Sequence, residues 1–348
     1  MNTIRDVARL ADVSVATASK VANKKGSVSQ KLTQRVLSAM EALDYRPNEI
    51  ARSLKVQQSQ TIGMIIPDVT NAFFTEVIRG VESEARSHGY SLILCDSNED
   101  PSLEQGNLNT LFARRVDGVL LAPTKVYDPT DRLTKRRFPL VFYDRVPPDF
   151  TGSAVVTDNL GAAYEGTRHL IEIGHRRLAI ITGRLSLSNG RDRLEGFRKA
   201  LQQAGLPLHD EYLQQGDFLL EGGYRCGMNL LRLPIPPTAI FSCNNEMTLG
   251  LMRALGEVGF ECPRDVSILG FDDFDWAANF RPRLTTMAQP SLEMGRQAAQ
   301  MLLRKIECDR EGSHGDEQKM IILRAELRVR DSTAPPATLE SGVRSIPA

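Results

Sequence analysis

Several features that mark other classes of protein are scarce or missing in this sequence. The five cysteines are widely spaced, without a Cys-x-x-Cys pair or a Cys/His cluster, so no zinc or other metal site is predicted. Their odd number fits a reducing cytoplasm. No run of 18 apolar residues occurs, and the segment from Met1 to Ala11 does not read as a signal peptide. These absences predict a cytoplasmic protein without a membrane span.

Motifs of common enzymes on doubly wound folds are missing as well. The sequence has no G-x-G-x-x-G fingerprint, no phosphate-binding loop and no nucleophile elbow. We therefore predict no catalytic residues and no cofactor, and an enzyme is the weaker hypothesis.

Charge is balanced over the whole chain but not along it. The 43 lysines and arginines equal the 43 aspartates and glutamates. Residues 1–60 hold ten basic and five acidic residues, a formal charge of +5, so the remainder carries −5. A basic head on an acidic body predicts a polyanionic partner for the head alone, although a solvated charged face would have the same composition.

Two short helical patterns separated by a tight break open the chain. Thr3 and Asp6 have the spacing of a capping box. After Asp12-Val13, Ser14 can cap a second helix over 15–22. Two short helices joined by a short turn are typical of a helix-turn-helix, whose second helix presents its N-terminal residues to base edges in the DNA major groove.

A third and a fourth helical pattern follow. We expect Ser29 to cap the third, which ends near Tyr45. Asn48 can cap the fourth, over 49–55. That segment is too short to be stable alone, since isolated helices need roughly 12 to 15 residues. It should fold only when a partner covers its apolar side.

This part of the chain resembles the DNA-binding head of the lactose/galactose-repressor family. Three segments in fixed order carry the resemblance: Val13-Ser14-Val15-Ala16-Thr17-Ala18-Ser19-Lys20-Val21, Val28-Ser29, and Tyr45-Arg46-Pro47-Asn48-Glu49-Ile50-Ala51-Arg52-Ser53-Leu54. It implies that the segment after Pro47 is a hinge helix, and that Leu54 is an apolar wedge that opens a minor-groove step.

The resemblance also implies which residues contact DNA. Val15 and Ala16 match base-reading positions, and small apolar side chains suit a thymine methyl group. Lys20 stands where the family usually has arginine, so it would meet a guanine as a point charge without a planar fork. Val15 and Ala18 could instead be core, and for Ala18 we expect this. The predicted DNA-binding residues are Thr3, Val15, Ala16, Thr17, Ser19, Lys20, Asn23, Ser29, Tyr45, Asn48, Ala51, Leu54 and Lys55.

After residue 60, strand-like and helix-like patterns alternate. Strands are predicted at 61–66, 91–95, 118–122, 140–143, 154–157, 178–182, 239–242, 267–271, 320–323 and 326–329. Helices are predicted at 73–88, 103–114, 160–173, 193–204, 223–231, 247–258 and 292–306. This alternation predicts an α/β core of two doubly wound lobes, with helices on both faces of parallel sheets.

The core resembles the type I periplasmic-binding-protein-like core of the same family. Arg193-x-x-Gly196-Phe197 and Leu269-Gly270-Phe271-Asp272-Asp273 are among the matching motifs. We therefore divide the chain into an all-α helix-turn-helix DNA-binding domain at 1–46, a hinge helix and linker at 47–60, a two-lobed effector-binding and dimerisation core at 61–330, and a tail at 331–348. The tail is rich in proline, serine and threonine and is expected to be disordered.

Polar and aromatic residues follow several predicted strands, where doubly wound folds bind ligands. Carboxylates and amides can accept hydrogen bonds from vicinal hydroxyls, and an aromatic face can cover an apolar ring, so the mixture suits a sugar-like ligand. The resemblance puts effector contacts on Phe73, Phe74, Asp144, Arg193, Phe218, Asn244 and Asp272. Arg145 and Arg184 complete the predicted effector-binding set.

Each of these residues has a structural alternative. Phe73 and Phe74 could be core residues of the first core helix. Asn244 and Asn245 could cap the next helix. The family usually has Asn-Asp at this pair, so one carboxylate is lost here. The hydroxyl of the ligand that this position would bind can therefore not be assigned from the resemblance.

A cluster of arginines raises a question about the charge of the effector. Arg184, Arg191 and Arg193 lie close together in one predicted loop, which favours an anionic effector such as a sugar acid or a sugar phosphate. Alternatively, Arg184 and Arg191 point to solvent or pair with Asp192 and Glu195.

Together these patterns predict a dimeric, DNA-binding transcription regulator, most simply a repressor. It would bind double-stranded palindromic operator DNA and be switched by a small sugar, sugar acid or sugar phosphate bound between the lobes. The alternative is a solute-binding or transport protein built on the same core; the basic, capped head argues against it.

Overall fold

The computed structural model describes residues 2–23, 27–45, 58–125, 138–147, 150–279, 281–312 and 319–337. Along the chain, the described residues divide into two compact units with a boundary between Gln60 and Thr61. The predicted hinge helix, with Asn48, Ala51, Leu54 and Lys55, lies outside the described residues.

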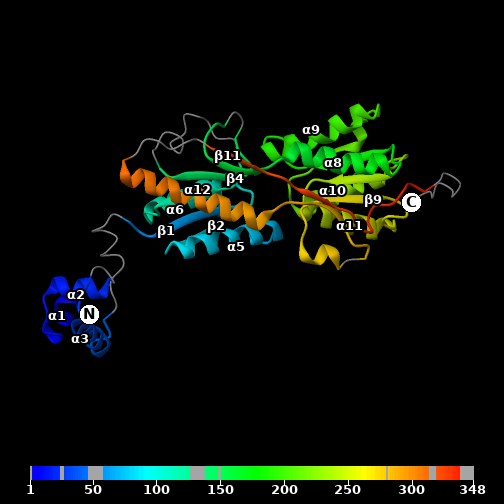
Figure 1. Cartoon of the computed structure of the whole chain (residues 1–348). Coiled ribbons are helices and arrows are strands. Elements are labelled where there is room, and N and C mark those ends of the chain that lie inside the picture. Colours follow the sequence, from blue (N-terminus) through cyan, green and yellow to red (C-terminus); the bar gives the residue numbers. More distant parts are fainter. Residues whose placement is uncertain are drawn as a thin grey trace. The chain divides into compact units, whose positions relative to one another are not determined.

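The first unit is a small bundle of three helices: α1 Ile4–Leu10, α2 Val15–Ala22 and α3 Gln30–Ala42. Figure 1 shows them in blue. Asp6 accepts the backbone N–H of Thr3 at 2.9 Å, and Ser14 accepts that of Thr17 at 3.1 Å, so the first two predicted caps are confirmed. The third is wrong, because Ser29 precedes α3 without a capping bond from its side chain.

The second unit contains two six-stranded sheets, each the centre of one lobe. The first sheet has the order β11-β5-β4-β3-β1-β2 and the second β12-β10-β9-β8-β6-β7. All pairings are parallel except that of β10 with β12. The strands are β1 Thr61–Ile66, β2 Ser91–Asp96, β3 Gly118–Leu121, β4 Leu140–Asp144, β5 Ala154–Thr157, β6 Leu178–Thr182, β7 Leu213–Gln215, β8 Ala239–Ser242, β9 Ser267–Phe271, β10 Thr285–Ala288, β11 Met320–Leu323 and β12 Glu326–Arg328.

Helices cover both faces of each sheet (Figure 1). In the first lobe, α5 and α12 pack on one face and α6 on the other; in the second, α8 and α9 share one face and α10 and α11 the other. Their bounds are α5 Ala72–Ser87, α6 Pro101–Ala113, α8 Asn159–Glu172, α9 Ser188–Gln203, α10 Leu220–Leu231, α11 Asn245–Val258 and α12 Ser291–Glu311, with short 3-10 turns at Asp210–Tyr212 and Asp275–Ala278.

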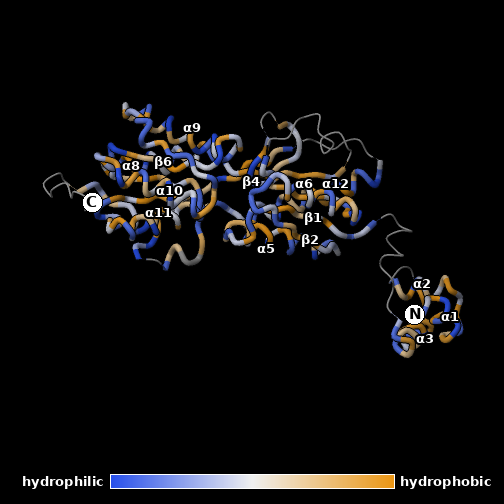
Figure 2. The backbone as a smooth tube through the Cα atoms, turned by 180° about the vertical axis from the view of Figure 1, so that it is seen from behind, coloured by the Kyte–Doolittle hydropathy of each residue, from blue (hydrophilic) through white to orange (hydrophobic). Residues whose placement is uncertain are grey.

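The apolar core explains this layering. Strands such as β1 and β6 are buried along most or all of their length, as expected for strands covered on both faces. Hydrophobic residues accordingly run along the interior strands of both lobes in Figure 2. Helices therefore cover these strands on both faces, and the strands end at one edge of each sheet, where the connections to the helices begin.

The chain crosses between the lobes at three places. β5 continues into α8 through Thr157-Asp158, β10 into α12 through Gln289-Pro290, and β11 into β12 through Arg324-Ala325. Each lobe is therefore assembled from separate parts of the sequence, and the two lobes share a three-stranded hinge (Figure 1).

The predicted disorder of the tail is wrong for its first seven residues. Residues 331–337 are described and pack along the second lobe, where Ser332 is fully buried. Its hydroxyl accepts the backbone N–H of Thr285 and donates to the carbonyl of Ile268, each at 2.7 Å. The segment is held by a few hydrogen bonds of its backbone and hydroxyl groups, which amino-acid composition does not reveal. Residues 338–348 lie outside the described residues.

Candidate functional site

The two sheets present the carboxyl ends of their strands to a common pocket. The pocket has about 360 Å³ of empty space, part of it open to solvent. Every lining residue ends or follows a strand or lies in the first two turns of the helix after it, the expected place for a ligand in doubly wound folds. The lining residues are Asp68, Asn71, Phe73, Phe74, Glu99, Asp144, Arg145, Asn189, Arg193, Phe218, Asn244, Asp272 and Gln289.

The start of α5 brings an amide and two aromatic rings to the pocket. Asn71 caps the helix by accepting the backbone N–H of Phe73 at 2.9 Å. The rings of Phe73 and Phe74 are 5.0 Å apart, edge to face. Both phenylalanines belong to the apolar core of the first lobe and also line the pocket, so the two interpretations of the sequence hold together.

Arg193 is held rigidly by the second lobe. Its side chain is buried, its Nε donates to Asn159 Oδ1 at 2.8 Å, and its Nη1 donates to the carbonyl of Cys243. The guanidinium carbon lies 3.6 Å from the ring centroid of Phe271. A planar, fixed donor of this kind can orient an oxygen-bearing ligand without losing conformational entropy of its own.

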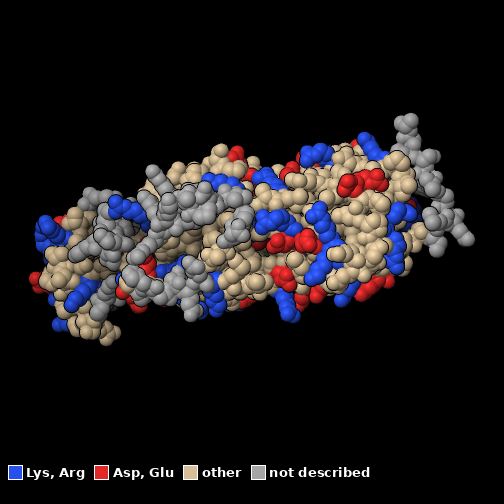
Figure 3. All heavy atoms as spheres, turned by 90° about the horizontal axis from the view of Figure 1, so that it is seen from above, with Lys and Arg blue, Asp and Glu red and all other residues tan. Residues whose placement is uncertain are grey.

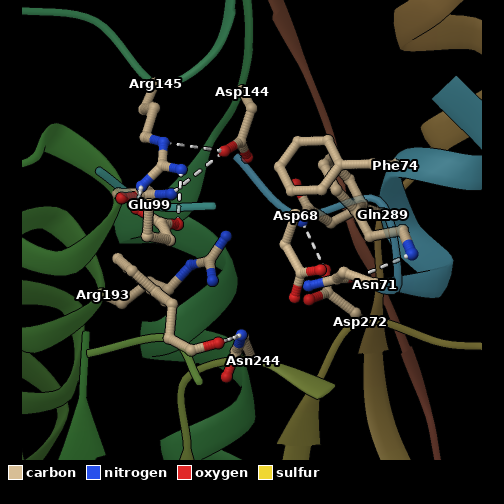
Figure 4. A pocket seen from close by; sticks show the side chains of 13 residues that line it. Asp68, Asn71, Phe74, Glu99, Asp144, Arg145, Arg193, Asn244, Asp272 and Gln289 are labelled. Carbon is tan, nitrogen blue, oxygen red and sulfur yellow. Dashed lines mark hydrogen bonds and ion pairs between the residues drawn. The ribbon is translucent and has the colours of Figure 1, made fainter. Parts of the chain in front are cut away.

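Two buried carboxylates face the pocket from opposite lobes (Figure 4). Burial raises the pKa of Asp144 to about 6, while the guanidiniums of Arg145 and Arg193 act in the opposite direction. Burial also raises the pKa of Asp272. Asp272 Oδ1 accepts from Gln289 Nε2 at 2.5 Å, and Gln289 Oε1 accepts from the hydroxyl of Thr157 at 2.5 Å. The pocket is thereby bonded to two of the three lobe crossings.

Arg145 and Glu99 form a buried ion pair at the other side of the pocket. Arg145 Nη2 lies 2.7 Å from Glu99 Oε1, and Arg145 Nη1 donates to Glu99 Oε2 at 3.3 Å. Arg145 Nε lies 3.6 Å from Asp144 Oδ2 and has no hydrogen-bond partner among the described residues. A buried donor left in this state marks a place where a ligand oxygen would be stabilised.

Four pocket residues have backbone conformations that side chains rarely adopt, and one of them, Glu99, has a φ angle of 55°. Asp144, Phe218 and Asp272 have φ angles of 63°, 72° and 74°. Such strain costs of order 1 kcal/mol or more per residue and is concentrated at functional sites. The ring of Phe218 also needs the bare backbone of Gly183, where an added Cβ would lie 1.9 Å from the ring.

Four hydrogen bonds cross from one lobe to the other beside the pocket. They join Arg184 Nη1 to the carbonyl of Glu99 at 2.9 Å, Val146 N to Ser188 Oγ at 3.0 Å, Asn189 Nδ2 to Asp144 Oδ2 at 3.3 Å, and Asn245 Nδ2 to Asn71 Oδ1 at 2.9 Å. These bonds hold the two lobes together beside the pocket.

The arginine cluster expected from the sequence is not formed. Helix α9 begins at Ser188, five residues earlier than predicted, so Arg191 and Arg193 lie on a helix. Arg191 is exposed, Arg193 is buried, and Arg184 bonds Glu99 without lining the pocket. The lining includes four carboxylates and only two guanidiniums, which removes the basis for the anionic effector.

Eight of the nine predicted effector residues line the pocket, and five further lining residues were not in the predicted set. Asn244 lines the pocket and also caps α11, as the structural alternative required. Asn245 bonds Asn71 and does not cap the helix. The missed side chains are Asp68, Asn71, Glu99, Asn189 and Gln289. Asp68 and Asn71 had a signal, since they follow the predicted strand at 61–66, whereas the strand before Gln289 was not predicted.

The first unit exposes the predicted base-reading residues. Val15, Ala16 and Lys20 are exposed on α2, whereas Ala18 is fully buried, as expected. Some predicted phosphate contacts already have partners within the bundle: the hydroxyl of Thr3 donates to Asp6 and that of Ser19 accepts from Asn23. On the face of the chain in Figure 3, charges of both signs are interspersed over the described part of the second unit.

Metal and membrane sites find no support in the described residues. No group of three or more His, Cys, Asp or Glu side chains there could hold a metal ion. Within the same ranges, no helix has both the length and the apolar character of a membrane span.

Comparison with known proteins identifies both parts of the chain. Residues 3–48 match the family described as bacterial regulatory proteins, lacI family, and residues 59–322 match periplasmic binding proteins and sugar binding domain of LacI family. The head match disfavours a solute-binding or transport protein.

Individual relatives agree with these matches. The ribose operon repressor of Escherichia coli K12 is 40% identical over 308 residues, which cover 88% of this chain and 93% of the relative. The lac repressor dimer bound to operator and the anti-inducer ONPF is 28% identical, with a TM-score of 0.83 over 96% of this chain and 99% of that one.

A LacI family regulator from Enterococcus faecium with bound ribose is 33% identical, with a TM-score of 0.69 over 80% of this chain and 100% of that one. The chain belongs to the lacI family of bacterial regulatory proteins: it is a DNA-binding transcriptional repressor that carries the family's effector-binding domain.

Proposed function

We propose that this repressor responds to a single neutral monosaccharide of pentose size, with ribose as the leading candidate. The observation that carries the proposal is the pocket itself. Its lining combines aromatic rings with hydrogen-bonding groups from both lobes, the mixture that a small sugar needs.

The charges of the pocket favour an uncharged ligand. A sugar phosphate or sugar acid would bring negative charge near the carboxylates of Glu99, Asp144 and Asp272, all buried. Neutral hydroxyls, by contrast, can donate to those carboxylates and accept from Arg193 and Arg145. The ribose named for the Escherichia coli relative and for the Enterococcus faecium structure supports the same choice.

The regulatory mechanism follows from binding between lobes. An effector that contacts both lobes prefers the closed arrangement and shifts the population toward it by its differential affinity. We infer that two such chains form a homodimer in the cytoplasm, that their heads read the two halves of a palindromic operator, and that the lobe arrangement controls how the heads are presented. The pocket binds the sugar and catalyses no reaction of it.

Calorimetric titration of the full-length protein with D-ribose, D-glucose and lactose tests the effector. We expect ribose to bind most tightly and to raise the melting temperature, since ligand binding stabilises the native state by mass action. Fluorescence anisotropy with palindromic fragments selected from a random library then tests whether ribose changes DNA affinity. Failure of ribose to bind at millimolar concentration would exclude the proposed effector.

A pocket variant and a matched surface variant complete the test. Asp272→Asn removes a buried pocket carboxylate, and Asp210→Asn makes the same change at an exposed position. Asp272→Asn should lose the effect of ribose on DNA affinity, while its DNA affinity without ribose, measured at the same salt concentration, should equal that of the wild type. Asp210→Asn should keep both properties.

A further inference from the structure

We propose that Glu99 sets the charge selectivity of the effector pocket: its carboxylate pairs with the terminal nitrogens of Arg145 and neutralises the guanidinium that a sugar acid would need, so the pocket accepts neutral sugars and rejects anionic ones. The inference rests on the proposed function, because it assigns a selectivity residue to that pocket.

Glu99 lies between arginines from both lobes. Its carboxylate bonds both terminal nitrogens of Arg145, at 2.7 and 3.3 Å, from within the first lobe. From the second lobe, Arg184 Nη1 donates to the Glu99 carbonyl at 2.9 Å and lies 3.8 Å from Glu99 Oε2. Figure 4 shows Glu99 directly below Arg145, with both side chains beside the pocket.

The carboxylate is fixed in place. The side chain of Glu99 is 4% exposed and that of Arg145 is 2% exposed. The Glu99 backbone has φ 55°, and its N–H donates to the carbonyl of Pro67 at 2.7 Å. A buried, bidentate pair in this geometry is a strong interaction, and its desolvated charges interact more strongly with a nearby ligand than exposed charges would.

The ion pair with Glu99 decides which ligand atoms Arg145 can bind. Arginine binds carboxylate or phosphate through two parallel N–H donors. In Arg145 those terminal donors face Glu99, and only Nε lacks a hydrogen-bond partner among the described residues. Nε can donate to a hydroxyl oxygen, whereas an anion at the same place would meet the carboxylates of Glu99 and Asp144 on either side of the guanidinium.

The substitution Glu99→Gln changes the charge and keeps the size. It leaves an acceptor for one Arg145 nitrogen, and it leaves Arg184 its bond to the backbone carbonyl. The pocket then has one negative charge fewer beside two guanidiniums, so anions should be tolerated while neutral sugars keep their contacts.

The experiment is calorimetric titration of the full-length protein, at constant ionic strength, with D-ribose and with the sugar acid D-ribonate. In Glu99→Gln, the affinity for ribonate relative to ribose should rise by about tenfold or more, as expected when a buried unit charge near the ligand is removed. Glu221→Gln is the matched control, because it removes the same charge from an exposed pair with Arg253 and should leave the ratio unchanged.

Arg184→Gln gives a test of opposite sign. It removes a cation from Glu99 and leaves the carboxylate less neutralised, so the ribonate-to-ribose ratio should fall below that of the wild type. Melting temperatures of both variants, with and without ribose, report whether each folds.

The outcomes separate the two proposals. A raised ratio in Glu99→Gln, with a lowered ratio in Arg184→Gln, supports the selectivity role. An unchanged ratio in Glu99→Gln, or equal loss of both ligands by a folded variant, overturns it and leaves ribose binding by the wild type in place. Absence of ribose binding by the wild type overturns the proposed function and this inference with it.

Discussion

Asn245 of the second lobe donates a hydrogen bond from Nδ2 to Oδ1 of Asn71 in the first lobe, at 2.9 Å. The same Asn71 oxygen also accepts from Phe73 N, so one amide caps α5 and holds the lobes together. The position where the family usually has aspartate thus has a donor here, which a carboxylate could not supply.

Asn245→Asp should therefore weaken effector binding. A carboxylate would face the Asn71 oxygen and stand near Asp272, so closure would lose a hydrogen bond and gain a repulsion. We expect a loss of about 1–3 kcal/mol, measured as ribose affinity by calorimetry. Asn229→Asp, at an exposed site on α10, is the control and should bind as the wild type does. Equal affinity in Asn245→Asp would show that this bond does not contribute to closure.

The raised pKa of Asp144, about 6, predicts a pH dependence of effector binding. If hydroxyls donate to the ionised form, the complex has the lower pKa and binding below pH 6 releases a proton. Ribose affinity should then fall as pH decreases through about 6, by up to tenfold per unit. Calorimetry in buffers of different ionisation enthalpy measures the released proton.

The free protein should show the opposite trend for this group. Its folded pKa lies above the unfolded value, so the ionised carboxylate costs native-state stability above pH 6, and that cost disappears as pH falls toward 4. Asp144→Asn should remove the step near pH 6. A step retained in this variant would point to another group, such as Glu246, whose pKa burial raises to about 7.

Ser332→Ala should destabilise the second unit. The hydroxyl is fully buried and serves both Thr285 N and the carbonyl of Ile268, so its loss leaves two backbone groups without that partner. The free energy of unfolding in urea should fall by about 1–3 kcal/mol. Ser83→Ala, at an exposed position on α5, should change it by less than about 0.5 kcal/mol. Two equal unfolding curves would indicate that the tail segment adds no stability.

Lys20→Arg tests base reading by α2. Lys20 is exposed on the helix, and a planar fork can bind guanine O6 and N7 bidentately where lysine cannot. The preference at one base pair per half-site should change by about 1–3 kcal/mol, measured with operator fragments substituted at each position. Lys31→Arg on α3 serves as control. A uniform change at all positions would assign Lys20 to the phosphate backbone.

Strand ends were predictable because burial on both faces leaves continuous apolar runs. Asp144 and Asp272 could be placed at the pocket from sequence, since each follows such a run, whereas Phe218 was placed by the family resemblance alone. The positive φ angles of Asp144, Phe218 and Asp272 could not be predicted, because the residue types aspartate and phenylalanine do not by themselves indicate a left-handed backbone.

Glu99 and the start of α9 show what sequence patterns leave out. Glu99 stands between Asn98 and Asp100, where a carboxylate is usually solvated; its buried carboxylate is instead paired with Arg145, 46 positions away. Helix α9 begins after Leu187, which has no side-chain cap, so the usual signal for a helix start is absent. Because the contact of Arg184 with Glu99 and the early start of α9 were both missed, Arg184, Arg191 and Arg193 were wrongly expected to form one cluster.

The segment from Met320 to Arg328 supplies an outermost strand to each sheet, β11 to the first and β12 to the second. A chain cut before residue 320 would therefore expose unpaired backbone on both lobes at once, and unpaired sheet edges favour aggregation. Neither lobe can be expressed as one uninterrupted gene fragment, so exchange of effector specificity between relatives by recombination requires transfer of the whole core.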